Sequence, residues 1–79
     1  MKTLYFVTSG AADATRASLP LHLAANGSVE VGQEAAVVLA GDGTELLSEE
    51  TANRLEGVGV PAVRDLLAKL LEHNVPVYV

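Results

Sequence analysis

Short apolar runs separated by small and polar residues dominate the chain, and three of these runs have the length of β-strands. They lie at residues 2–8, 34–40 and 75–79, and each is continuous rather than alternating in apolar character. Continuous apolar strands are typical of a parallel sheet covered on both faces. We therefore predict three buried parallel strands.

The segment after the first strand has the signals of a helix. Asp13 suits an N-cap, because its carboxylate accepts hydrogen bonds from backbone N–H groups one turn further on. The predicted helix covers residues 14–25 and ends at Asn26-Gly27, a pair suited to a left-handed stop. Pro20 lies inside it and removes one backbone hydrogen bond, so we expect a bend there.

Two further helical patterns lie between the second and third strands. Residues 44–55 predict either one helix or two short turns that divide near Ser48. Residues 61–73 carry apolar side chains at i, i+3, i+4, i+7 and i+8, which predicts one amphipathic helix that opens on Pro61 and stops at Asn74. Strands that alternate with helices indicate an α/β fold with a parallel sheet, in one domain over residues 1–79. Because the third strand ends on the last residue, we expect this domain to be the amino-terminal part of something longer.

Composition narrows the classes of partner. Seventy-nine residues without cysteine give a small core that no disulfide stabilises, and 49% hydrophobic residues then favour oligomerisation. A net charge of −5 argues against binding nucleic acid or anionic membranes. The apolar runs are too short for a membrane span or a signal peptide, so we expect a cytoplasmic protein.

Small polar loops follow the first two strands, at the carboxyl edge where open α/β sheets bind ligands. Ser9 and Gly10 form the first loop, and Gly41 and Asp42 belong to the second. Backbone N–H groups at such a loop favour an anion or a small ligand. Ordinary turn geometry explains the same residues, and that alternative stays open.

Catalytic chemistry finds little support in the sequence. His22 lies among leucines, as a packed or interface histidine does, and His73 suits the end of a helix. Two histidines without cysteine do not have the spacing of a metal site. The chain shows no paired nucleophile and base, so we assign no catalytic residue, metal or cofactor and lean against an enzyme.

Several short motifs together resemble the small DsrE/DsrF-like proteins. They are Thr8-Ser9-Gly10, Asp13, Arg16-Ala17, Pro20-Leu21, residues 38–42 (VLAGD) and residues 75–79 (VPVYV). The resemblance implies a three-layer α/β/α fold of Rossmann-like topology, assembled as a trimer or hexamer. It also implies, for members with an active cysteine, a role in sulfur relay, in which persulfide sulfur passes to a partner protein.

The chain departs from that family where the sulfur chemistry resides. The family's cysteine commonly follows the strand that corresponds to residues 75–79, and this chain holds no cysteine. Sulfur relay is therefore expected only if a cysteine follows residue 79, and Ser9, Gly10, Gly41 and Asp42 then form the rim of the pocket. Two other hypotheses are a module that binds a small ligand or anion at that rim, and a structural subunit without a ligand.

Overall fold

The computed structural model describes residues 2–79, which fold around a three-stranded parallel sheet. Its strands are β1 (Lys2–Val7), β2 (Glu34–Leu39) and β3 (Val77–Tyr78). They lie in the order β1-β2-β3, with Val37 of β2 opposite Val77 of β3. The predicted α/β class with a parallel sheet is confirmed.

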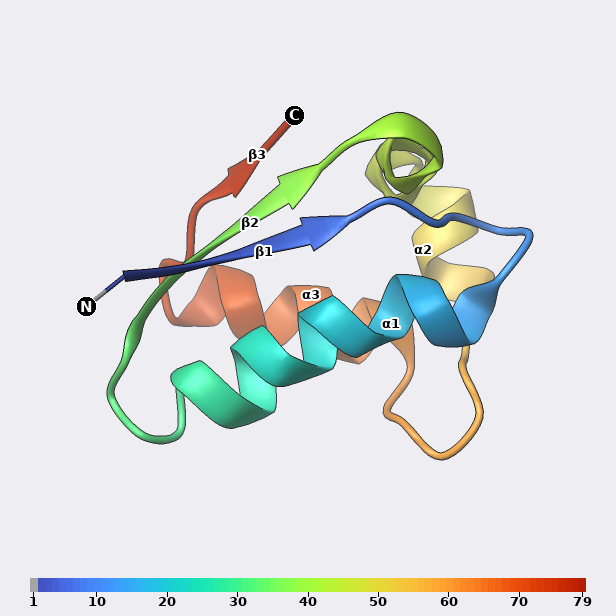
Figure 1. The fold of residues 1–79 in the computed structure, drawn as a ribbon. Coiled ribbons are helices and arrows are strands. Elements are labelled where there is room, and N and C mark those ends of the chain that lie inside the picture. Colours follow the sequence, from blue (N-terminus) through green and yellow to red (C-terminus); the bar gives the residue numbers. More distant parts are fainter. Residues whose placement is uncertain (1) are drawn as a thin grey trace.

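The connections between the strands are mainly helical. They are α1 (Ala14–Leu23), the π-helical turn η1 (Ala24–Ser28), the 3₁₀ helix η2 (Gly41–Leu47), α2 (Glu49–Arg54) and α3 (Val63–Glu72). Figure 1 shows α1 and α3 side by side on one face of the sheet, while η2 and α2 lie beyond the carboxyl ends of β1 and β2.

The hydrophobic core lies between the sheet and these two helices. Val7 and Val37 enter it from the sheet, Leu21 from α1, and Leu66 and Leu70 from α3, and all five side chains are almost fully buried. The apolar period of residues 61–73 therefore does place one side of α3 in the core, as predicted.

The other face of the sheet is open, contrary to the prediction of strands buried on both sides. Along β1, Tyr5 and Val7 turn toward the core, whereas Leu4 and Phe6 are 53% and 57% exposed. Tyr78 of β3 is 51% exposed. Both long helices of residues 2–79 lie on the opposite face, so the three-layer arrangement stays a prediction.

The end of the first helix differs from the prediction. The chain does not stop at Asn26-Gly27 but widens into η1, where the N–H of Val29 donates to the carbonyl of Ala24 at 3.0 Å. The left-handed backbone comes later, at Gly32 (φ 71°). A π-helical turn lets the chain gain a residue without leaving the helix, and this moves the turn into β2 further along the sequence.

The later helix boundaries are partly as predicted. Ser48 does divide residues 44–55, because its hydroxyl caps α2 by accepting from the Thr51 N–H at 3.4 Å. Asn74 has φ 58° and ends the last helix. Pro61, however, does not open α3: Ala62 is the extended N-cap residue and forms a β-bridge with Glu56.

Candidate functional site

The two loops predicted to form a ligand site do meet at the carboxyl edge of the sheet. A methyl group placed on Gly10 would lie 2.4 Å from the carbonyl oxygen of Asp42. Gly10 is buried, Ser9 is half-buried, and Gly41 and Asp42 are exposed. The structure thus brings the four predicted residues into one neighbourhood, and their binding of a ligand stays a prediction.

A carboxylate from the chain itself accepts a hydrogen bond from the backbone of the first loop. The backbone N–H of Ala11 donates to Oε1 of Glu45 at 2.8 Å. This oxygen would lie 2.1 Å from a methyl group on Gly10, so the carboxylate covers the loop directly. Residues 11 and 45 are 34 positions apart, and nothing in their spacing reveals the contact.

The second loop is also satisfied from within. The sequence suggested a loop at residues 41–43, but they begin η2, and the N–H of Gly43 donates to the carbonyl of Ala40 at 2.9 Å. The Thr44 hydroxyl donates to the carbonyl of Gly41 at 2.8 Å. The first loop lies against the second, because Gly10 is close to both Asp42 and Glu45. An anion that binds at this edge has to compete with the Glu45 carboxylate for the Ala11 N–H.

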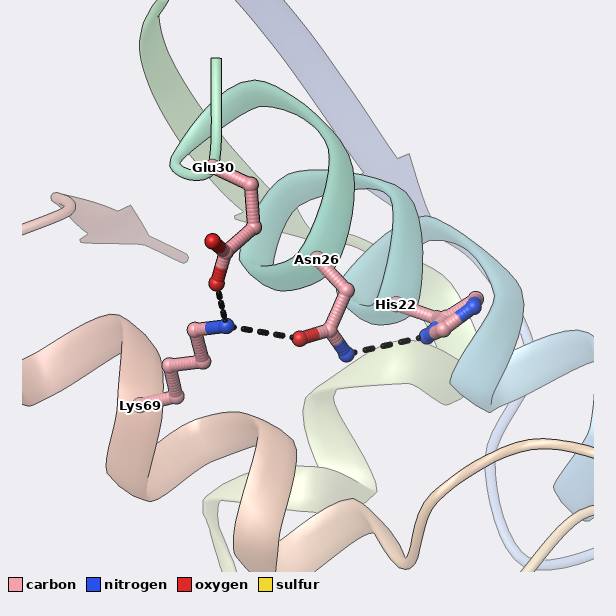
Figure 2. Close-up of polar contacts among 4 residues, drawn as sticks. All are labelled: His22, Asn26, Glu30 and Lys69. Carbon is pink, nitrogen blue, oxygen red and sulfur yellow. Dashed lines mark hydrogen bonds and ion pairs between the residues drawn. The ribbon is translucent and has the colours of Figure 1, made fainter. Parts of the chain in front are cut away.

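A chain of polar side chains connects α3 to η1, the turn that follows α1, on the helical side of the molecule (Figure 2). The Lys69 ammonium donates to Oδ1 of Asn26 at 2.7 Å and forms an ion pair with Glu30. The Asn26 amide nitrogen lies 3.1 Å from Nδ1 of His22. Because an amide NH₂ only donates, His22 accepts through Nδ1. Lys69 thus joins α3 to the segment around η1 through Asn26 and Glu30.

This contact perturbs one ionisable group. The hydrogen bond and charge of Lys69 lower the pKa of Glu30 below its ordinary value of 4.5, and the charge of His73 acts in the same direction. A carboxyl whose pKa is lower in the folded state stabilises the fold above its unfolded pKa, and the effect is lost as the pH falls through the folded pKa.

We expect Glu30→Gln to remove part of the acid sensitivity of folding. In urea unfolding followed by circular dichroism, the wild-type chain should lose stability below about pH 4.5, and the variant should lose less over the same range. Lys69→Met, which keeps the aliphatic stem, should have the same effect. Identical pH profiles for all three proteins would contradict the assigned contact.

A cavity of about 440 Å³ lies at the amino edge of the sheet, opposite the predicted ligand site. Lys2, Glu34 and His73 line it, together with Gln33, whose side-chain oxygen accepts from the Ser28 hydroxyl at 3.2 Å. The lining carries both signs of charge and therefore favours no particular class of ion.

On the open side of the sheet, Leu4, Phe6 and Tyr78 are exposed, and Val38 and Pro76 are half-buried. Phe6, Val38 and Tyr78 stand in register across the three strands. Leu4 is paired in the next row with Ala36, which is fully buried, and Lys2 is paired with Glu34 in the row after that. We call these residues, together with Pro76 two positions before Tyr78, the open face. Sequence reasoning missed it because continuous apolar strands suggested two covered faces. The useful signal was the small number of long helices.

Within residues 2–79, no group of three or more histidine, aspartate and glutamate side chains is placed to hold a metal ion. Among the same residues, no helix has the length and apolar character needed to cross a membrane. Comparisons of the chain with protein-family models, curated proteins and solved structures gave no match. The interpretation of function therefore depends on the geometry of the chain itself.

Proposed function

We propose that this chain is an α/β assembly module that functions by burying its open face against another layer of polypeptide. One observation carries the proposal: Leu4, Phe6 and Tyr78 are each more than half exposed on one side of a sheet whose other side is well packed. Contiguous apolar patches larger than a few hundred Å² mark interaction sites, and the largest patch of a typical monomer, about 300–600 Å², is often functional.

Covering the patch contributes a free energy of the same order as the cost of association. Phe6 and Tyr78, each about half exposed, together leave about 150–250 Å² of side chain in water. With Leu4, Val38 and Pro76 the patch reaches about 300–400 Å². At about 25 cal/mol per Å², covering it contributes roughly 8–10 kcal/mol, which is comparable to the association cost of about 4–15 kcal/mol.

Exposed apolar residues also occur away from the open face, and Leu19 and Leu23 lie four residues apart on α1. Leu23 lies on α1, Val58 in the loop before α3, and Leu71 on α3 itself. Single exposed apolar side chains are normal on protein surfaces. They provide matched controls for the open face, because Leu71 is 70% exposed but belongs to a different surface.

Thiol labelling in the cells that make the protein tests this function. The chain contains no cysteine, so Phe6→Cys or Leu71→Cys introduces a single reactive site. If the open face is covered, a permeable maleimide should label the Phe6→Cys thiol several-fold more slowly than the Leu71→Cys thiol. Both should react equally fast after urea. Equal rates in the cells would overturn the proposal.

A second candidate function, anion binding at the carboxyl edge, is favoured by the contact between Glu45 and the Ala11 N–H. That contact indicates that the loop of Ser9 and Gly10 presents a backbone donor to a negatively charged oxygen. A ligand with a phosphate, sulfate or carboxylate group would bind by replacing the glutamate. Gly41 and Asp42 would then form the opposite side of the site.

We expect Glu45→Ala to reveal such binding. Thermal unfolding with sulfate or phosphate should show a higher melting temperature for this variant, because a ligand that binds the folded state stabilises it. The wild-type chain should respond less, since its own carboxylate competes. Glu50→Ala, on the exposed first turn of α2, serves as the control. A response no larger in Glu45→Ala than in Glu50→Ala would rule this candidate out.

The DsrE-like sulfur-relay role and the trimeric or hexameric assembly stay predictions from the resemblance. The chain holds no thiol to carry a persulfide. The intact mass of the protein from its native source tests the role: a mass well above 8.2 kDa, with a thiol that reacts with Ellman's reagent, would support it. A mass of 8.2 kDa would exclude it.

A further inference from the structure

We infer that the layer covering the open face is a second copy of this chain, packed sheet against sheet about a two-fold axis. This inference rests on the proposed function, because it names the partner of the same face. Three features support it: the charge on the face, the order of its rows, and its area.

The open face is electrically neutral, unlike the rest of the chain. Its charged residues are Lys2 and Glu34, which are paired in register on neighbouring strands. Because these two charges cancel, the whole net charge of −5 lies on the other surfaces. Two copies would therefore repel one another in most orientations, but not when their open faces meet. A strongly basic partner, in contrast, would be attracted to the other surfaces.

The rows of the open face fit one two-fold arrangement. An axis that crosses β2 at right angles between Ala36 and Val38 makes the strands of the two copies antiparallel. Leu4 of each copy then lies over Phe6 of the other, whereas Ala36, which is fully buried within its own sheet, makes no contact across the interface. The same axis places the row of Lys2 and Glu34 in one copy at the opposite end of the interface from the same row in the other copy. Like charges of the two copies are therefore far apart.

The area predicts a weak dimer. About 800 Å² per partner is buried in an interface of standard size, whereas the apolar patch supplies only about 300–400 Å² before its polar rim is counted. The two apolar patches together supply only about 600–800 Å², below the range of stable complexes, so the polar rim must add to the interface and the dimer is weak. We therefore expect monomer and dimer to exchange at micromolar concentrations rather than form a permanent dimer.

Sedimentation equilibrium of the purified chain tests whether the copy binds. The apparent mass should rise with concentration from 8.2 kDa toward twice that value. Phe6→Glu should weaken the dimer at least about 100-fold, because it places a charge in an apolar contact. Leu71→Glu should leave the dimer unchanged. Circular dichroism verifies that each variant is folded, and Phe6 is exposed enough that we expect it to be.

Single-cysteine variants test the orientation independently of Phe6→Glu. Leu4→Cys and Phe6→Cys proteins, mixed and treated with a short bis-maleimide that spans the roughly 10 Å between packed sheets, should form cross-linked dimers more efficiently than either protein alone. Ala68→Cys, on the exposed side of α3, should form few. If the mixture is no better than the separate proteins, the two-fold arrangement is wrong.

The outcomes separate this inference from the proposed function. A purified chain that stays at 8.2 kDa at all concentrations, with Phe6→Cys still protected in cells, overturns the second copy but leaves an assembly module with another partner. A dimer that Phe6→Glu does not weaken also overturns the inference. If, in addition, Phe6→Cys is fully labelled in cells, the proposed function fails as well.

Discussion

Gly43→Ala should be the most destabilising small substitution in the chain. A methyl group at this position would lie 1.9 Å from the carbonyl oxygen of Val7 and 2.7 Å from its carbonyl carbon. That oxygen also accepts the N–H of Ala40 at 3.0 Å, which joins the end of β1 to the end of β2. Because the obstructing atoms are backbone, no side-chain rotation relieves the clash, and the two strand ends must separate.

We expect a loss of about 3 kcal/mol in the free energy of unfolding for Gly43→Ala, measured by urea unfolding. A chain of this length has only about 4–12 kcal/mol in total. Gly27→Ala is the matched control: nothing lies within 4 Å of its added methyl group, and its φ is not positive. It should be neutral or stabilise by about 0.4–1 kcal/mol. A Gly43→Ala protein as stable as Gly27→Ala would contradict the close contact at Val7.

Leu66→Ala should have the second large effect. The side chain is 1% exposed and lies in the core cluster with Val37 of the sheet and Leu21 of α1. Truncating a buried leucine costs about 2–5 kcal/mol, because the apolar contacts are lost and a cavity remains. In a domain this small, we expect partial unfolding already at room temperature.

Leu71→Ala is the control that separates the effect of burial from the effect of truncating any leucine on α3. It is the same substitution on the same helix, but Leu71 is 70% exposed. Its effect should stay within about 0.5 kcal/mol. Thermal and urea unfolding of the two variants measure the difference directly. If Leu71→Ala lowers the free energy of unfolding as much as Leu66→Ala does, the side of α3 that carries Leu66 is not the side that packs on the sheet.

Local features of the chain were largely predictable from the sequence. The Asp13 carboxylate caps α1 by accepting from the Arg16 N–H at 3.0 Å, as a short acceptor before a helical pattern should. Ser48 and Asn74 also act at the helix ends where the sequence placed them. Each of these signals depends on neighbours within one turn, so no tertiary information is required.

Features that depend on distant residues were not predictable. The contact between Glu45 and Ala11 joins residues 34 positions apart, and it decides whether the carboxyl-edge loop is free. The exposure of Phe6 is a second case, since an apolar strand has the same composition whether one face or two are covered. The neighbourhood of the two carboxyl-edge loops was predictable, because parallel strands bring their ends to one edge.

Fluorescence of Phe6→Trp gives the most direct test of the open face as an interface between copies. The chain has no tryptophan, so the emission reports on this position alone. At high concentration we expect blue-shifted emission that acrylamide quenches poorly, and dilution should restore a water-like spectrum. Leu71→Trp should be quenched readily at every concentration. If Phe6→Trp is as readily quenched as Leu71→Trp throughout the range, the open face is not covered by a second copy.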